Sequence, residues 1–457
     1  MWKPWIKRVG AMICVGSCTM SAILILAWML MGHPGIADRW PLIDAFFRLA
    51  ALLAVVAMLI GLFFVRGSKW ARMVMAAAFL LFFGQSLYAI QYLAPHWLGW
   101  ATGFQCQTVG QGPIAPAGHI QSEMARRLDV CMEELCRKGF AGVVLVAKND
   151  RIELCKGYGY ADKTRHVPFD QETVFDIGSL TKQFTAAAVL KLQMLGKLTV
   201  EDKITRFLQS VPPDKSQITV HQLLTHTSGL SDGFGDDYDP MSRDQIVAAI
   251  LKSKLDHQPG EVHAYSNAGY SLLGAIIEVV SGQPYEEFLR VQLLGPAGMM
   301  QTGYKFPQWP REKLSHGYTL TGFDWGTPLD QPWADDGPSW NLRANGGILS
   351  TVGDLFKWHR AVKGEAILST EAKTELFHPH VREEEGSDSF YGYGWAISQT
   401  GSGRKIITHN GSNAIFYVDF RWYVDNDILF LIASNQAAHM ACSHQSEILT
   451  ALLGSSE

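Results

Sequence analysis

The chain has 457 residues, more than one ordinary domain needs, and its formal net charge is −4. The charge is uneven, because residues 1–100 hold eight Lys and Arg against two Asp and Glu, whereas the remainder is acidic. An acidic downstream part argues against nucleic acid as a partner. The seven cysteines show no CxxC pair, so a zinc site is not expected.

Three apolar runs near the start of the chain predict membrane-spanning helices. They cover residues 9–31, 49–65 and 73–93, and each approaches the roughly 20 apolar residues that a helix needs to cross a bilayer. Basic residues precede the first run and fill the loop between the second and third, whereas the loop between the first and second holds only Arg39. The positive-inside rule therefore places the N-terminus in the cytoplasm and everything beyond about residue 95 outside a bacterial cytoplasmic membrane.

Lipidation is the alternative for the first run, because Val15-Gly16-Ser17-Cys18 loosely resembles a bacterial lipoprotein cleavage site. Such a site closes its apolar segment, whereas here apolar residues continue well past the cysteine. We therefore favour a three-span anchor over 1–94, a Gly- and Pro-rich linker over 95–118, and a separate domain over 119–457.

The start and the end of this domain carry the predicted strands. An amphipathic helix is expected over 120–137, followed by a β-hairpin with strands at 141–147 and 151–156. Cysteines beyond the spans are expected to be mostly free and buried, although the outer compartment permits disulfides. Four strands are expected near the end, before a closing helix over 440–453; they lie at 394–398, 405–409, 414–420 and 428–434.

The middle of the domain reads as helical and irregular. Residues 223–230 form a helix end with a loop, and a strong helix is expected over 268–280. Residues 305–345 are long and irregular with four tryptophans, and we interpret them as the rim of a substrate site. Helices inside a chain with strands at both ends predict an α+β fold, with one antiparallel sheet flanked by helices.

The segment 175–184 contains a serine and a lysine three residues apart, Ser179 and Lys182, ahead of an alanine-rich run. Positions i and i+3 share one helix face, so a nucleophile and its base could meet there. The first helical turn also leaves backbone N–H groups free for an oxyanion. The pattern is weak alone, since Ser402 and Lys405 repeat it where no helix is expected.

Two further pairs follow in the chain. Tyr265-x-Asn267 is the only Tyr-x-Asn, and His409-x-Gly411 is the only His-x-Gly outside the membrane region. With Ser179 ahead of them, they resemble the penicillin-binding-protein and class C β-lactamase superfamily of serine hydrolases. Flanking segments extend the resemblance over roughly residues 120–455; they are 223–229, 259–260, 265–274, 346–351, 391–395 and Asn435. The resemblance implies a sheet with an additional all-helical subdomain.

The resemblance also implies catalytic roles. Ser179 would attack an acyl carbonyl, and a neutral Lys182 would act as its base. Tyr265 would relay the proton to the leaving group and help activate the deacylating water; the alternative is a half-buried tyrosine that caps a loop. Asn267 would orient Lys182 and the substrate amide, although it could also cap the helix that starts at Ala268.

A substrate-binding strand is implied at the third pair. His409 and Gly411 would share one face of an edge strand, where the glycine lets a substrate backbone approach closely. By family analogy, the backbone N–H groups of Ser179 and Ser412 would hold the oxyanion. Class C β-lactamases carry lysine where His409 stands, and histidine is charged only part of the time near pH 7. This difference weakens a β-lactamase assignment. Histidine at this position resembles the pattern of some D,D-peptidases, D-aminopeptidases and esterases of the superfamily.

We therefore expect a membrane-anchored serine hydrolase that acts on amides or esters, including peptidoglycan-type peptides and β-lactams, through an acyl-enzyme on Ser179. No metal or cofactor is required for this chemistry. The alternative is a receptor that binds a wall fragment or penicillin without turnover and signals through the spans, which the very short inner loops disfavour. His226 and the run 383–385 are interpreted as structural, and the sequence does not indicate an oligomeric state.

Overall fold

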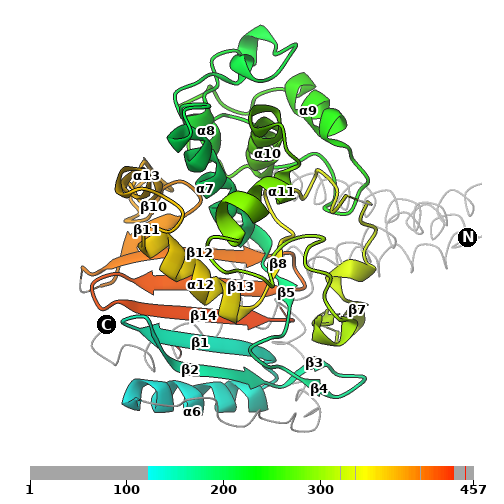
Figure 1. Cartoon of the computed structure of the whole chain (residues 1–457), viewed down its shortest axis with the longest axis vertical. Helices are drawn as coiled ribbons and strands as arrows, with labels where there is room; N and C mark the ends of the chain where they lie inside the picture. Colours follow the sequence, from blue (N-terminus) through cyan, green and yellow to red (C-terminus); the bar gives the residue numbers. More distant parts are fainter. Residues whose placement is uncertain (1–121, 320, 335, 402, 437–447, 449–457) are drawn as a thin grey trace, which may run out of the picture. The chain divides into compact units, whose positions relative to one another are not determined.

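The computed structural model describes residues 122–436 except 320, 335 and 402, together with Ile448 (Figure 1). The predicted spans over 1–94 and linker over 95–118 lie outside the described residues, as does the closing helix apart from Ile448. Among the residues that are described, no helix combines the length and the apolarity needed to cross a bilayer.

An antiparallel sheet of eight strands forms the centre of the described domain (Figure 1). Its order is β2-β1-β14-β13-β12-β11-β10-β9, so the first hairpin of the domain pairs with its last strand. This confirms the predicted α+β fold with one antiparallel sheet. The strands are β1 (Gly142–Lys148), β2 (Arg151–Tyr158), β9 (Val381–Arg382), β10 (Phe390–Tyr391), β11 (Ala396–Gln399), β12 (Lys405–Ser412), β13 (Tyr417–Tyr423) and β14 (Ile428–Ser434).

Helices account for most of the remaining regular structure. Figure 1 shows α8 to α11 gathered together, with α7 between them and the sheet. The helices are α6 (Glu123–Arg137), α7 (Thr181–Met194), α8 (Val220–Leu224), α9 (Arg243–Lys252), α10 (Asn267–Ser281), α11 (Tyr285–Leu289), α12 (Val352–Lys363) and α13 (Thr370–Leu376). Short strand pairs join β3 (Tyr160–Asp162) to β4 (Val167–Pro168), β5 (Phe175–Asp176) to β8 (Leu349–Ser350), and β6 (Gly317–Tyr318) to β7 (Asp324–Gly326).

β1 and β14, in the inner part of the sheet, are buried on both faces. Side chains alternate along each strand, so successive residues enter different cores. On β14, Leu429 and Leu431 point into the core shared with α7 and α12. Phe430 and Ile432, between and after them, point into a second core shared with α6. A strand covered on both faces is expected to be apolar throughout, which is why β14 could be located from sequence without error at residues 428–434.

Most of the other predicted strands have bounds that differ by one to three residues in the structure, and two of them bear on the site. The strand predicted to start at residue 414 begins at Tyr417, because Asn413 Oδ1 accepts hydrogen bonds from the backbone N–H of Ile415 and Phe416 and closes a turn there. The strand predicted at 405–409 continues to Ser412. It is also not an edge strand of the sheet, since β12 lies between β13 and β11.

The irregular segment 305–345 is partly core rather than only a rim. Trp309 and Trp340 are 7% and 4% exposed, and each belongs to a buried apolar cluster. Trp325 is less buried, and its ring lies 5.7 Å from that of Tyr238 and 6.1 Å from that of Phe416. Of the thiols expected to be free and buried, Cys136 and Cys155 are unpaired but only half-buried.

Candidate active site

Ser179 lies in a 3-10 turn, η2 (Gly178–Leu180), immediately before α7. The β5–β8 pair holds the segment that leads into this turn, and Ile177 N–H donates to the Ile348 carbonyl over 2.9 Å. Asp176 then accepts a 2.7 Å hydrogen bond from the Gly178 N–H. The serine side chain is half-buried and therefore still accessible. The backbone that leads to it is held by the hydrogen bonds of Ile177 and Gly178.

The turn packs backbone-to-backbone on the end of β12. β11 pairs with β12 only as far as Thr408. Beyond Thr408, the edge of β12 that β11 leaves unpaired contacts η2. A Cβ added to Gly411 would lie 2.0 Å from the Ile177 carbonyl oxygen and 2.8 Å from the Ser179 nitrogen. The chain itself therefore fills the space that a side chain at position 411 would need, so this contact requires glycine. The same contact brings the amides of Ser179 and Ser412 to one place.

A buried carboxyl group connects the two halves of this contact. Asp176 is 1% exposed, and besides Gly178 it accepts a 3.0 Å hydrogen bond from Asn413 Nδ2, just beyond β12. Burial raises the pKa of this carboxyl to about 7, against the two hydrogen bonds that favour its charged form. Asp176 thus ties the turn carrying Ser179 to the turn that follows Ser412.

Lys182 is fully buried and its amine contacts three oxygens. Nζ lies 2.6 Å from Asn267 Oδ1, 2.8 Å from the Asn345 carbonyl oxygen and 3.1 Å from Ser179 Oγ. The first two oxygens can only accept, so they take both N–H groups of a neutral amine. The lone pair of that amine is then left to accept the hydroxyl proton of Ser179, which is the geometry of a general base.

The electrostatics agree with a neutral amine. Burial lowers the pKa of Lys182 to about 7, while the nearby Asp232 and Asp237 oppose this shift. Tyr265 is the other proton-carrying group at Ser179, and its ring lies 4.7 Å from the Lys182 nitrogen. Burial raises the pKa of this phenol, and a hydrogen bond with Ser179 only partly offsets that, so Tyr265 stays protonated at neutral pH. Of the two, Lys182 is the group able to take a proton.

Asn267 points its oxygen at Lys182 because Asp232 fixes its amide. Asp232 Oδ1 accepts from Asn267 Nδ2 over 3.0 Å and from the Asn267 backbone N–H over 3.1 Å. Asn267 does not cap the helix, as considered from the sequence. The cap is Ser266, whose Oγ accepts from the Gly269 N–H, and Asn267 is the first residue of α10.

His409 lies on β12 beside the site but is uncharged. Its Nδ1 donates to the Asn410 carbonyl oxygen over 2.6 Å, and its Nε2 lies 2.9 Å from the Tyr391 hydroxyl. Burial is the main cause that lowers the pKa of His409 to about 4, and a protonated Lys182 would add to this shift. The expectation of partial charge near pH 7 is therefore wrong, because sequence reasoning had no view of this burial.

Sequence reasoning missed Asn345, Asp232 and Tyr391 as parts of the site. Asn345 acts through its backbone carbonyl, which carries no residue-type signature. Asp232 lies in an acidic, Gly-rich loop over 231–240 in which no residue was singled out from the sequence, although it orients Asn267. Tyr391 had a usable signal, since it lies in one of the flanking segments that carried the family resemblance, 391–395.

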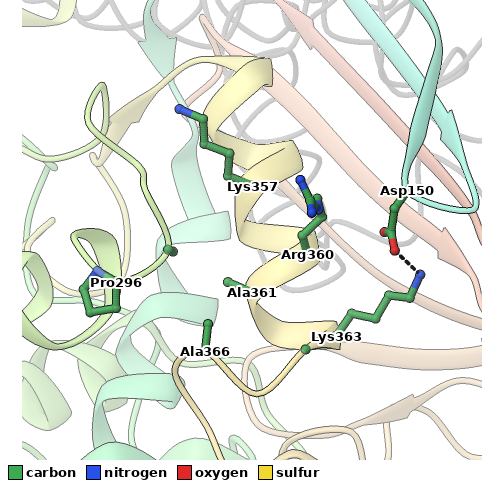
Figure 2. A pocket seen from close by; sticks show the side chains of 9 residues that line it. Asp150, Pro296, Lys357, Arg360, Ala361, Lys363 and Ala366 are labelled. Carbon is green, nitrogen blue, oxygen red and sulfur yellow. Dashed lines mark hydrogen bonds and ion pairs between the residues drawn. The ribbon is translucent and has the colours of Figure 1, made fainter.

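A hollow of about 550 Å³ elsewhere on the domain does not contain these groups (Figure 2). It lies beside α12 and is lined by Lys357, Arg360 and Lys363, among others. Two of these cations are already neutralised: Lys357 binds Asp354, and Lys363 binds Asp150 and Asp427. We therefore place the chemistry at Ser179.

Comparison with known proteins assigns the chain to a family. A model of the family described as Beta-lactamase matches residues 119–452. The chain belongs to the beta-lactamase family. Penicillin-binding protein 4* of Bacillus subtilis (strain 168) is 29% identical over 336 residues, covering 69% of this chain and 73% of the relative. The putative penicillin-binding protein PbpX of that organism is 31% identical over 261 residues, which span 57% of this chain but only 63% of PbpX.

Solved structures of family members share the fold. The octameric penicillin-binding protein homologue from Pyrococcus abyssi has a TM-score of 0.63 at 27% identity, covering 73% of this chain and 78% of that one. The D-amino acid amidase from Ochrobactrum anthropi SV3 has a TM-score of 0.61 at 25% identity, covering 73% and 98%. The family and these relatives confirm the predicted superfamily, and they identify the protein as a serine hydrolase.

Replacing Gly411 by alanine should disable the site without abolishing the fold. The new Cβ would overlap the Ile177 carbonyl, and overpacking of this kind costs about 1–3 kcal/mol and shifts backbone. We expect a lower melting temperature and slower labelling by a serine-reactive fluorophosphonate, measured per folded molecule. Gly401→Ala is the matched control, because an added Cβ there meets nothing within 4 Å. Full acylation by Gly411→Ala would contradict the backbone contact described above.

Proposed function

We propose that the protein hydrolyses amide or ester bonds through an acyl-enzyme on Ser179, with Lys182 as the base. The observation that carries this proposal is the neutral-amine geometry, in which two carbonyl oxygens accept from Lys182 Nζ and Ser179 Oγ lies 3.1 Å away. A serine is a weak nucleophile unless an adjacent base removes its proton. Here burial lowers the pKa of the base to about 7, so that a large fraction of Lys182 is unprotonated at neutral pH without a second positive charge beside it.

Acylation follows from these positions. Ser179 Oγ attacks the substrate carbonyl carbon while its proton passes to Lys182 Nζ. The resulting oxyanion is held by the backbone N–H groups of Ser179 and Ser412, a type of contact worth about 3–4 kcal/mol per donor in related chemistry. The proton then reaches the leaving amine or alcohol through Tyr265, the bond to that group breaks, and Ser179 is left as an ester. Water attacks this ester in turn and regenerates the serine.

The preferred substrates are proposed to lack a free carboxylate at the leaving side. A neutral His409, hydrogen-bonded to Tyr391 and Asn410, offers no positive charge to such a group. Asp232 and Asp237 near Lys182 add negative charge. Amides and esters of small acids or amino acids suit this site better than acyl-D-Ala-D-Ala or β-lactams. One solved structure with this fold, at 25% identity, is a D-amino acid amidase, which supports the same direction.

A substrate panel on the full chain tests this function. We expect continuous turnover of a p-nitrophenyl ester and a D-amino-acid amide, weaker turnover of an acyl-D-Ala-D-Ala peptide, and loss of all three in Ser179→Ala. Labelling by a fluorophosphonate should be lost in the same variant. Ser402→Ala is the matched control, because it removes the serine of the second Ser-x-x-Lys. Equal labelling of Ser179→Ala and wild type would refute the mechanism, and a single turnover would indicate a receptor instead.

We also propose that the domain is anchored to the bacterial cytoplasmic membrane and faces outward. The support is in the sequence, namely the three apolar runs over 1–94 and the basic residues beside them. A tether would keep the site close to wall-derived substrates. Protease added to spheroplasts should then digest the catalytic domain, and protection of the domain until the membrane is lysed would contradict the orientation.

A further inference from the structure

His226 lies in the loop that follows α8 and is 1% exposed. Its backbone has φ of +57°, a left-handed conformation that non-glycine residues rarely adopt. From the sequence we interpreted it as a structural loop residue. Among the described residues, no hydrogen bond joins it to Ser179. A buried histidine held in a strained conformation suggests a more specific task.

Two hydrogen bonds of His226 bracket Tyr265. Its carbonyl oxygen accepts from the Ala264 N–H over 2.8 Å, and its ring Nδ1 accepts from the Ser266 N–H over 3.0 Å. One residue therefore holds the backbone on both sides of the tyrosine. The remaining ring nitrogen, Nε2, has no hydrogen-bond partner within the described part of the chain, so the ring's polar contact is the one to Ser266.

The ring of His226 also lies against the tyrosine itself. Its centroid is 4.3 Å from that of Tyr265 with the planes tilted by 33°, and 4.7 Å and 5.0 Å from those of Tyr391 and Tyr270. Tyr265 is 38% exposed, and the rings of Tyr391 and His409 lie farther from it than that of His226, each with a centroid 6.5 Å away. Backbone and side chain of Tyr265 are thus both restrained by one neighbour.

The acceptor role requires a neutral histidine, since a backbone N–H can only donate to an unprotonated Nδ1. Burial is the first cause that lowers the pKa of His226 well below its ordinary range. The imidazole is therefore in its Nε2–H tautomer at physiological pH and adds no positive charge beside Lys182.

We propose that His226 is a positioning residue that sets the direction of the Tyr265 hydroxyl by accepting from the residues on either side of it. The inference rests on the proposed function, in which Tyr265 carries the proton to the leaving group. A displacement of about 1 Å at a catalytic group costs roughly 100-fold in rate. Loss of the Nδ1 acceptor is therefore expected to lower kcat more than it changes KM.

Two amide substitutions of the full-length protein separate this role from space filling. His226→Asn places an amide oxygen near the position of Nδ1, whereas His226→Gln fills more of the volume but places its amide near Nε2. We expect His226→Asn to keep most of kcat for a p-nitrophenyl ester and His226→Gln to lose roughly 10- to 100-fold, with KM nearly unchanged. If His226→Gln matches or exceeds His226→Asn, or if the loss lies in KM alone, the ring only fills space and the proposal is wrong.

A double-mutant cycle with Tyr265→Phe tests whether His226 acts through the tyrosine. In that background, His226→Gln should cost little further activity, because the hydroxyl that it misdirects is absent; a full additive loss would overturn the proposal. Melting temperatures of each variant report the folded fraction, so rates are compared per folded molecule. Failure of the proposed function is distinguishable, since it would leave fluorophosphonate labelling intact in Ser179→Ala whatever the histidine variants do.

Discussion

The site depends on one buried amine whose two hydrogens are committed elsewhere. Lys182 donates to Asn267 Oδ1 and to the Asn345 carbonyl, which leaves its lone pair for Ser179. Neither acceptor is itself an ionised carboxylate, so neither stabilises a proton on the amine as strongly as an ion pair would. Asp232 contributes from one step away, by holding the Asn267 amide in the orientation that presents its oxygen. Burial lowers the pKa of the amine, and the two hydrogen bonds orient its lone pair toward Ser179.

The fold brings these groups together through close backbone contacts. η2 meets the end of β12 with no side chain between them, and Gly178 and Gly411 are the residues that allow it. Asp176 links the same two segments by accepting from Gly178 and Asn413. The amides of Ser179 and Ser412 are therefore placed by the main chain and not by mobile side chains. Such an arrangement costs little reorganisation during a reaction.

Features with a local signature could be predicted from sequence. The i, i+3 spacing predicted the Ser179–Lys182 pair, and continuous apolarity predicted β14, because both patterns are set by residues close together in the chain. Features that depend on distant segments could not be predicted. The Asn345 carbonyl has no signature in residue type, and the neutral state of His409 arises from burial against Tyr391. Gly411 was singled out from the sequence, but its close contact with the chain's own Ile177 carbonyl could not be predicted.

The pH dependence of kcat/KM for a neutral p-nitrophenyl ester tests the central claim most directly, after subtraction of the Ser179→Ala rate. If an unprotonated Lys182 is the base, the value rises with pH through about 7 and is level above it. Asp176 also titrates at about 7, so the same inflection must persist in Asp176→Asn. A rate that continues to climb to pH about 10, where an ordinary lysine loses its proton, would contradict the account.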